Sequence, residues 1–580
     1  MAAMWYGNQV ESDACNFGAL AVIHPLLERM KVAEIVDQHL PADPRAEFPH
    51  GKVLTLLLAA RLYQPTALSN VAQWAADSAA DVLWEMPVDK INDDRLGRSL
   101  DAFFNQRHSI LAHLALHISR EFGVSLSQLH YDPTHILFEG AYENAEPREG
   151  VVGADRIRSD DSLEPAQITK GRGTDDAPEG ALMIHAGLCT YVDDLGPLPL
   201  FGHTVDGNQN GHTAVAEQFA LIRKHLRPPD LTLFSDRGTF SVGHLRRLLQ
   251  DGYHAVCSAP WLEFRPLFDE HRQRLKWTKA SYLSVEQQRR RKDKSALPLE
   301  HYELAAVRHT LVDEETKQGV PCRVVFVFST ADQKVVRKQR QKQIDKLRQG
   351  LDYIQGSVAA GNRSTDPAAV ARRVEKLFGK KQAARYFTWE MVSLSKKEQQ
   401  ALPTARRGCK LPTHRFLFQF DNAAVKQDEA YDGYSALVTT VPPPQASVDL
   451  LFTKFKQQNY CEHANRQFKG PLAVRPIFLQ TPRRVEALVF LMMIALTAYF
   501  LLQRMYRQSL PSDATPKERR TTSETILRAF NSYILLMHRT RLGREVQPTR
   551  LSTRQRDLLQ RLGFRSPAQI LSQLLPRPPT

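Results

Sequence analysis

Three acidic residues stand at positions where they could hold metal ions for chemistry at phosphorus. Asp132 lies inside the strand-like run QLHYDPTHILFEG, Asp236 directly follows LTLFS, and Glu462 lies in the polar stretch FKQQNYCEHANRQFKG. The two aspartates could meet near the carboxyl ends of neighbouring strands, with Glu462 completing a triad. Hard oxygen ligands suit Mg²⁺ or Mn²⁺. A pair of such ions can activate a water or a 3′-hydroxyl and stabilise the leaving oxygen, so the pattern predicts phosphodiester cleavage and strand transfer.

The stretch around Glu462 is expected to form one amphipathic helix. At about 100° per residue, one narrow stripe carries Phe455, Gln458, Glu462 and Lys469. The opposite side, which we expect to pack on a core, carries Tyr460, Cys461, Ala464 and Phe468. Taken alone, Glu462 and Lys469 would be an ordinary solvated pair. The order of the three acids and their mixed strand and helix context favour a site.

The composition points to an anionic partner and a reducing compartment. The chain has 580 residues, a net charge of +14 and a pI of about 9.4, which is equally typical of DNA-binding and RNA-binding proteins. Its six cysteines show no short paired spacing of a zinc knuckle or disulfide framework. No apolar leader is expected at the start of the sequence. The most apolar run, 487–502, is shorter than the roughly 20 residues that a membrane-spanning helix needs. We therefore expect a buried helix there, no membrane partner and a cytoplasmic, nucleoid-associated protein of a prokaryote.

The pattern of elements divides the chain into five expected segments. Residues 1–126 are predicted to be all helical and to bind DNA or self-associate; two of their helices, joined at 64–66, have a spacing compatible with helix-turn-helix and equally with an ordinary helical pair. Three strands followed by alternating helix and strand indicate a mixed α/β sheet. The expected segments are 1–126, a first catalytic part 127–259, a β-rich basic insertion 260–446, a second catalytic part 447–510 with the Glu462 helix, and a basic helical tail 511–580.

A strongly basic run lies within the expected insertion. Residues 334–350, KVVRKQRQKQIDKLRQG, alternate lysine and arginine with amides and a few apolar residues. Such a run either follows a phosphate backbone or is a solvated helix face, and the two alternatives are evenly balanced here.

The motifs resemble those of the DDE transposases of insertion sequences in the broad IS4 group, most closely the IS1634 family. The motif of that group is Tyr, two residues, Arg, three residues, Glu, six residues, Lys; this chain has Phe455, Gln458, Glu462 and Lys469 at those intervals. Asp132 in DPT and Asp236 in DRG match the motifs of the first and second aspartates. The resemblance extends over roughly residues 18–505.

The resemblance implies an RNase H-like catalytic domain interrupted by a β-rich insertion. It implies that Asp132, Asp236 and Glu462 hold Mg²⁺, or Mn²⁺ in its place, as two ions, and that Lys469 contacts a phosphate near the cleaved bond. The residues expected to contact DNA are Phe455, Gln458, Lys469, Arg237 and Arg466.

This sequence also departs from the pattern of that group. Phe455 lacks the tyrosine hydroxyl, and Gln458 replaces a forked cation by a neutral amide, which weakens phosphate binding. Pro133 removes a backbone donor from an expected interior strand, so we expect a bulge or irregularity there.

The expected function is therefore that of a DNA transposase. It would bind the terminal inverted repeats of its own element, cut at their ends and join the 3′-hydroxyls to target DNA. Because both ends must be held together, we expect a homodimer on double-stranded DNA. Two alternatives remain from the sequence: a catalytically silent, transposase-derived DNA-binding protein, and a stand-alone metal-dependent nuclease.

Overall fold

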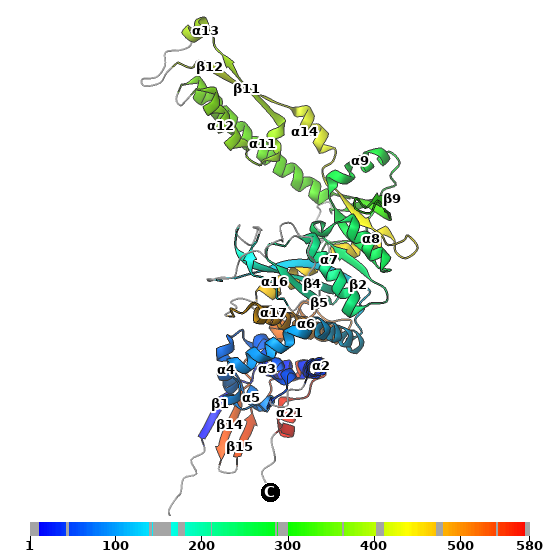
Figure 1. Cartoon of the computed structure of the whole chain (residues 1–580), viewed down its shortest axis with the longest axis vertical. Helices are drawn as coiled ribbons and strands as arrows, with labels where there is room; N and C mark the ends of the chain where they lie inside the picture. Colours follow the sequence, from blue (N-terminus) through cyan, green and yellow to red (C-terminus); the bar gives the residue numbers. More distant parts are fainter. Residues whose placement is uncertain are drawn as a thin grey trace, which may run out of the picture.

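A mixed β-sheet forms the centre of the molecule (Figure 1). The computed structural model describes residues 11–41, 46–138, 142, 164–171, 180–209, 211–284, 287, 300–361, 365–401, 411–470, 479–540 and 543–574. Within these residues the sheet has ten strands, in the order β3-β4-β2-β6-β7-β13-β10-β9-β8, with β5 also paired to β4. The strands are β2 (Gln128–Leu137), β3 (Thr169–Lys170), β4 (Leu182–Asp193), β5 (Gly196–Asp206), β6 (Thr232–Ser235), β7 (His254–Ala259), β8 (Thr278–Lys279), β9 (Tyr302–Val312), β10 (Gly319–Ser329) and β13 (Tyr434–Thr439).

The sheet changes from antiparallel to parallel pairing at β2. Strand β2 pairs antiparallel with β4, which in turn pairs antiparallel with β5. On its other side β2 pairs parallel with β6, and β6 pairs parallel with β7. The parallel connections run through helices, as parallel pairing requires: α7 (Gly211–Leu221) with the π-helical turn η3 (Ile222–Leu226) before β6, and η4 (Arg237–Thr239) with α8 (Val242–Gln250) after it. A mixed α/β architecture was predicted and is confirmed.

The apolar run at 487–502 forms the core of the long helix α17 (Pro482–Gln508). Its most apolar window has a mean hydropathy of 2.3, which is enough for a membrane span by composition, and that window is wholly buried inside the protein. The helix packs against β5, where the Thr497 hydroxyl donates to the Pro199 carbonyl at 2.7 Å. Burial of this kind is typical of the core helix of a soluble protein, and the predicted buried helix is confirmed.

A layer of helices from the N-terminal part packs on α17. Its members are α1 (Leu20–Arg29), α2 (Val32–His39), α3 (His50–Tyr63), α4 (Val71–Ser78), α5 (Ala80–Leu83) and the long α6 (Asp93–Phe122). Helix α3 is buried along most of its length. Helices α3 and α4 are the pair whose spacing is compatible with helix-turn-helix. Helix α4 exposes Gln73 and Asp77, which bond to each other at 2.8 Å, and it has no lysine or arginine that could contact a DNA phosphate.

The N-terminal part is not all helical, and the C-terminal part is not a helical tail. Strand β1 (Glu11–Cys15) pairs antiparallel with β14 (Leu535–Thr540), which forms a hairpin with β15 (Gly543–Pro548). Helices α18 (Pro516–Arg519), α19 (Ser523–Arg528), α20 (Thr553–Leu562) and α21 (Pro567–Leu574) complete this end. The prediction failed because the partners of β1 lie at the other end of the chain, and a single short strand carries little local signal.

The expected β-rich insertion is also wrong as a separate module. Strands β8, β9, β10 and β13 extend the central sheet, with helix α9 (Trp261–His271) beside them. What projects is an arm, residues 330–429, that is mainly helical (Figure 1). It contains α11 (Thr330–Ala359), α12 (Pro367–Phe378), η5 (Gln382–Tyr386), β11 (Phe387–Ser393), α13 (Lys396–Gln400), β12 (His414–Phe420) and α14 (Asn422–Glu429). The arm has its own apolar cluster around Leu347, Leu351 and Phe416. Strand periodicity was read correctly, but it does not say which sheet a strand joins.

Candidate active site

The parallel pairing of β2 and β6 brings Asp132 and Asp236 side by side. The register joins Gln128 to Thr232 and continues to Tyr131 opposite Ser235. Asp132 and Asp236 directly follow the last pair of that register, at the point where β6 ends. Neighbouring strands lie about 4.8 Å apart. The prediction that the two aspartates meet at neighbouring strand ends therefore agrees with the strand order, although β2 itself continues past Asp132.

The end of β6 is fixed by a single turn of 3₁₀ helix. The Asp236 carboxylate accepts a hydrogen bond from the backbone N–H of Arg237 at 2.6 Å, and the Asp236 carbonyl accepts one from the Thr239 hydroxyl at 2.6 Å. These bonds hold the strand end while the Asp236 side chain stays exposed.

The irregularity expected at Pro133 is absent. The pairing of β2 with β4 runs through Pro133 and Gly187 without a change of register. The register shift in this part of the sheet lies between Cys189 and Thr190, in the pairing of β4 with β5. Strand β6 ends opposite Tyr131, so no strand on that side needs a donor from Pro133.

The stretch around Glu462 forms two helices rather than one. Helix α15 (Val448–Lys456) ends before α16 (Asn459–Lys469) begins, and the link is a tight turn in which the N–H of Gln458 bonds to the carbonyl of Phe455. The Gln458 side chain fixes this turn to β2: its amide donates to the Tyr131 carbonyl at 3.0 Å and its oxygen lies 2.9 Å from Nδ1 of His130. The predicted single stripe is therefore wrong for Phe455 and Gln458.

Within α16 the amphipathic pattern largely holds. Cys461, Ala464 and Phe468 are buried, as predicted, whereas Tyr460 is 37% exposed. Helix α16 packs against β2, β5 and α17. This packing leaves Glu462 exposed on the other side of the helix.

The three acids influence one another electrostatically. The pKa of Asp132 is raised from 3.8 to about 7, first by burial and then by the negative charges of Asp236 and Glu462. A hydrogen bond from the Asn465 amide at 2.7 Å and the positive charge of Lys469 act in the opposite direction. The site therefore concentrates negative charge around one half-buried carboxylate.

This donor set fits a divalent ion in its chemistry. Three carboxylates provide the hard oxygen ligands that Mg²⁺ and Mn²⁺ prefer. Burial and, after it, the charges of Asp236 and Glu462 raise the pKa of Asp132, and a bound cation would offset the repulsion between these charges. As placed, the described residues include no group of three acidic, histidine or cysteine side chains already gathered around one point.

The residues expected to contact DNA fall into two groups. Phe455 of α15 is half-buried against apolar side chains, and the half-buried Gln458 side chain bonds to β2, so both already have contacts within the protein. Arg237 and Arg466 are exposed and follow Asp236 and Glu462 closely in the chain. Lys469 is half-buried, and its charge reaches Asp132.

Sequence reasoning missed two residues of this site. Asn465 is buried and donates to Asp132; its position between Glu462 and Lys469, one helical turn from each, would have placed it on their face. His130 stacks on Phe234 at 4.8 Å, and burial lowers its pKa to about 4. The ring is therefore neutral near pH 7 and donates from Nδ1 to Gln458, a partnership that no sequence pattern indicates.

Asn465 gives a specific prediction for catalysis. Asn465→Ala removes a donor that stabilises the ionised Asp132, so Asp132 keeps its proton to higher pH. We expect metal-dependent activity near neutral pH to fall about 10- to 100-fold and to recover partly in alkaline buffer. The measurement is the pH profile of cleavage. Gln467→Ala is the matched control, since Gln467 lies on the same helix and bonds to His463; an equal loss in both variants, with no change of profile, would contradict this role.

A second prediction concerns the pH dependence of metal binding. Because Asp132 is largely protonated below about pH 7, binding of Mn²⁺ must release a proton there, and affinity should rise about tenfold per pH unit until it levels off above about pH 7. Folding stability has the opposite pH dependence. The pKa of Asp132 is 3.8 in the unfolded chain and about 7 in the folded one, so the ion-free protein loses stability as the pH rises between these two values. Calorimetry in two buffers of different ionisation enthalpy would measure the released proton. Affinity that is flat from about pH 6 to pH 8 would refute the assignment.

Comparison with known proteins adds one partial match. A family model described as a domain of unknown function (DUF4277) matches residues 13–116, from β1 into α6. No curated protein matches the chain.

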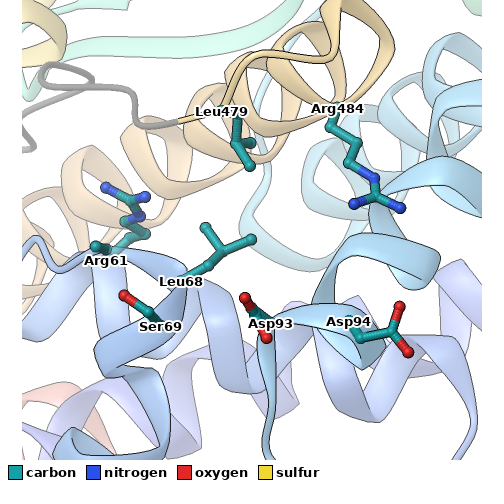
Figure 2. Close-up of a pocket in the computed structure, with 8 residues that line it drawn as sticks. Arg61, Leu68, Ser69, Asp93, Asp94, Leu479 and Arg484 are labelled. Carbon is teal, nitrogen blue, oxygen red and sulfur yellow. The ribbon is translucent and has the colours of Figure 1, made fainter.

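The matched segment borders a pocket of about 360 Å³ beneath α17 (Figure 2). Arg61 and Ser69 lie on one side of it, Asp93 and Asp94 on another, and Arg484 reaches in from α17. The charges of Asp93 and Asp94 act on Arg484, which also bonds to Asp101. Opposite charges therefore offset each other here, unlike the carboxylates around Asp132.

Proposed function

We propose that the protein is a DNA transposase of the DDE type, similar to the IS4 group and most closely to the IS1634 family. The observation that carries the proposal is the pairing of β2 with β6, which puts Asp132 beside Asp236, together with the reach of the Glu462 charge to the same carboxylate. Two acids far from Asp132 in the sequence thus bring their negative charges to bear on its carboxyl group.

We further propose that β5, β4, β2, β6 and β7 form an RNase H-like catalytic core. Support comes from the strand order, in which the antiparallel strands β5, β4 and β2 are followed by β6 and β7, which pair parallel. The aspartates lie where the pairing changes, which is where crevices form at the edge of an open α/β sheet.

The residues of the chain have separable roles in this proposal. Asp132, Asp236 and Glu462 would hold Mg²⁺ or Mn²⁺, which when bound supplies Lewis-acid activation at the attacking and leaving oxygens of the phosphodiester. Asn465 orients the Asp132 carboxylate and favours its ionised form. The Gln458 bonds keep the link between α15 and α16 against β2, and so fix where α16, the helix that carries Glu462, begins. Lys469, at the end of α16, provides a positive charge beside the acids for a phosphate.

The DNA partner is supported by charge outside the catalytic core. The surface of α11 in the arm exposes Lys334, Lys338, Lys342, Lys346 and Arg348. Its base is fixed to the sheet by Asp432, which accepts from Arg337 at 3.3 Å and Arg340 at 2.9 Å. A basic arm that is anchored at its base suits contact with a phosphate backbone, and a homodimer would hold two DNA ends together.

The test is cleavage of a labelled element end by the purified protein with Mg²⁺ or Mn²⁺. We expect nicks at the terminus of the inverted repeat and joining of the 3′-hydroxyl to a target duplex. Cutting without preference for the terminus would favour a stand-alone nuclease.

A catalytically silent DNA-binding protein is the second candidate. It is favoured by Phe455 and Gln458, which depart from the motif of the resembling group and whose half-buried side chains contact other parts of the protein. Specific binding of the repeat without any cutting, in Mg²⁺ and in Mn²⁺, would establish this alternative.

A further inference from the structure

A pocket of about 680 Å³ lies at the edge of the central sheet away from the carboxylates. Its wall includes His254, the first residue of β7, which pairs with Thr232 at the start of β6. Asp236 follows the last residue of the same strand. The length of β6 therefore separates this pocket from the acids, and neither site contributes a residue to the other.

Two arginines face each other across the strands that line the pocket. Arg323 of β10 pairs directly with Arg308 of β9, and Thr439 of β13 pairs with Arg323 on its other side. Like charges at directly opposed positions destabilise a sheet unless something offsets them. Among the described residues no Asp or Glu lines the pocket, and none forms an ion pair with Arg308 or Arg323. The negative charge of Asp230 acts on His254 of the same wall.

The Arg323 side chain is buried with part of its hydrogen-bonding capacity unused. It is 8% exposed, and one terminal nitrogen donates to the carbonyls of Val441 and Ala446 at 2.7 and 3.1 Å. Its Nε is buried and has no partner within the described residues. A buried guanidinium that lacks both a counter-charge and one acceptor is costly, because each unmet donor forfeits its hydration.

Two hydroxyls add donors to the same wall. Thr439 Oγ1 accepts from the N–H of Val441 at 3.1 Å, and Thr440 Oγ1 accepts from the N–H of Ala255 at 2.9 Å. Each hydroxyl therefore keeps its own proton to donate. The wall combines guanidinium and hydroxyl donors, with His254 and His309 alongside.

We propose that this pocket binds an organic phosphate, namely a phosphomonoester with an apolar or aromatic body of up to nucleotide size. Two forked cations and two hydroxyls match the several oxygens of a phosphate better than the two of a carboxylate. The remaining wall is apolar, with Leu249, Pro321 and Pro442 among its members, and the volume is in the range of small-molecule sites. The phosphate could belong to a free small molecule or to the 5′ end of a DNA strand, since both present the same group.

The experiment is titration of the full-length protein with phenyl phosphate, followed by calorimetry. We expect saturable binding, at least about tenfold tighter than for inorganic phosphate or benzoate, because only phenyl phosphate offers both the dianion and the ring. Arg308→Ala removes an exposed side chain and should weaken binding at least about tenfold without affecting folding. Lys279→Ala is the matched control, as it removes one exposed positive charge from β8 of the same sheet outside the pocket. Asp132→Asn should leave binding unchanged.

Several outcomes would overturn the assignment. Absence of saturable binding to the wild-type protein, equal loss in Arg308→Ala and Lys279→Ala, or equal affinity for benzoate would each do so. Competition by a 5′-phosphorylated hexanucleotide, but not by its 5′-hydroxyl form, would identify a strand end as the source of the phosphate. Failure of such a hexanucleotide to compete, with phenyl phosphate still bound, would identify a free small molecule.

Discussion

Asp132→Asn, Asp236→Asn and Glu462→Gln are each expected to abolish metal-dependent cleavage of an element end, with a loss of about 10³-fold or more. Each change replaces a hard anionic ligand by a neutral amide of the same shape, and loss of about 4 kcal/mol of charge stabilisation corresponds to a factor of about 10³ in rate. The measurement is the rate of nicking at saturating protein, with DNA binding measured in parallel. Binding should be retained, because the exposed basic surface of the arm is unchanged.

Asp194→Asn is the matched control for these variants. Asp194 is an exposed carboxylate in the turn between β4 and β5, outside the register that unites the acids. The Asp194→Asn variant should cleave the element end at the rate of the wild-type protein. For Asp132→Asn we also expect higher thermal stability of the ion-free protein at about pH 8, since the amide removes a buried charge that Asp236 and Glu462 repel. Retention of cleavage in all three site variants would remove the basis for the DDE assignment.

The second large effect is expected on folding, from the buried ion pair between Arg107 and Glu486. Arg107 Nε lies 2.8 Å from Glu486, and the side chains are 5% and 1% exposed, at the contact between α6 and α17. Glu486→Ala would leave the guanidinium buried without its partner, so we expect a loss of about 3–5 kcal/mol in the free energy of unfolding. Denaturant unfolding followed by circular dichroism measures the change.

Two further variants test the cause of that loss. Arg107→Met combined with Glu486→Leu removes both charges, and it should recover part of the stability. Recovery would be incomplete because Glu486 also accepts from the N–H of Ala166 at 2.5 Å. Arg98→Met breaks an exposed pair with Asp94, in which the side chains are 63% and 67% exposed, and should change stability by about 1 kcal/mol or less. If Glu486→Ala and Arg98→Met lowered the free energy of unfolding equally, burial would not be the cause of the loss.

The local patterns of the chain predicted several features correctly. The apolar run at 487–502 is buried in α17, and Cys461, Ala464 and Phe468 form the packed face of α16. Both follow from periodicity and composition over a few turns, which neighbouring residues alone impose. The placement of Asp132 in a strand and of Asp236 after a strand could also be predicted locally, because each strand is a run of a few apolar residues.

The failures came where one segment had to find a distant partner. The break between α15 and α16 is held by Gln458 bonding to β2, more than three hundred positions earlier in the chain, and no helical pattern contains that information. Likewise β1 pairs with β14, and four strands between 260 and 446, namely β8, β9, β10 and β13, join the central sheet, whereas β11 and β12 pair only with each other. Alternation with a period of two is the same whichever strand lies alongside, so it leaves the choice of partner open.

The sequence by itself thus determined which side chains are available for chemistry, and it identified the segments whose local pattern is strong, such as the buried helix α17 and the packed face of α16. Only the tertiary structure decided that β2 and β6 pair in the register that aligns Asp132 with Asp236, that Asn465 reaches Asp132, and that Arg308 opposes Arg323. The physical reason is that propensity and periodicity act between neighbours in the chain. Register and burial are instead set by contacts between segments far apart in sequence, and these appear only when the sheet is assembled.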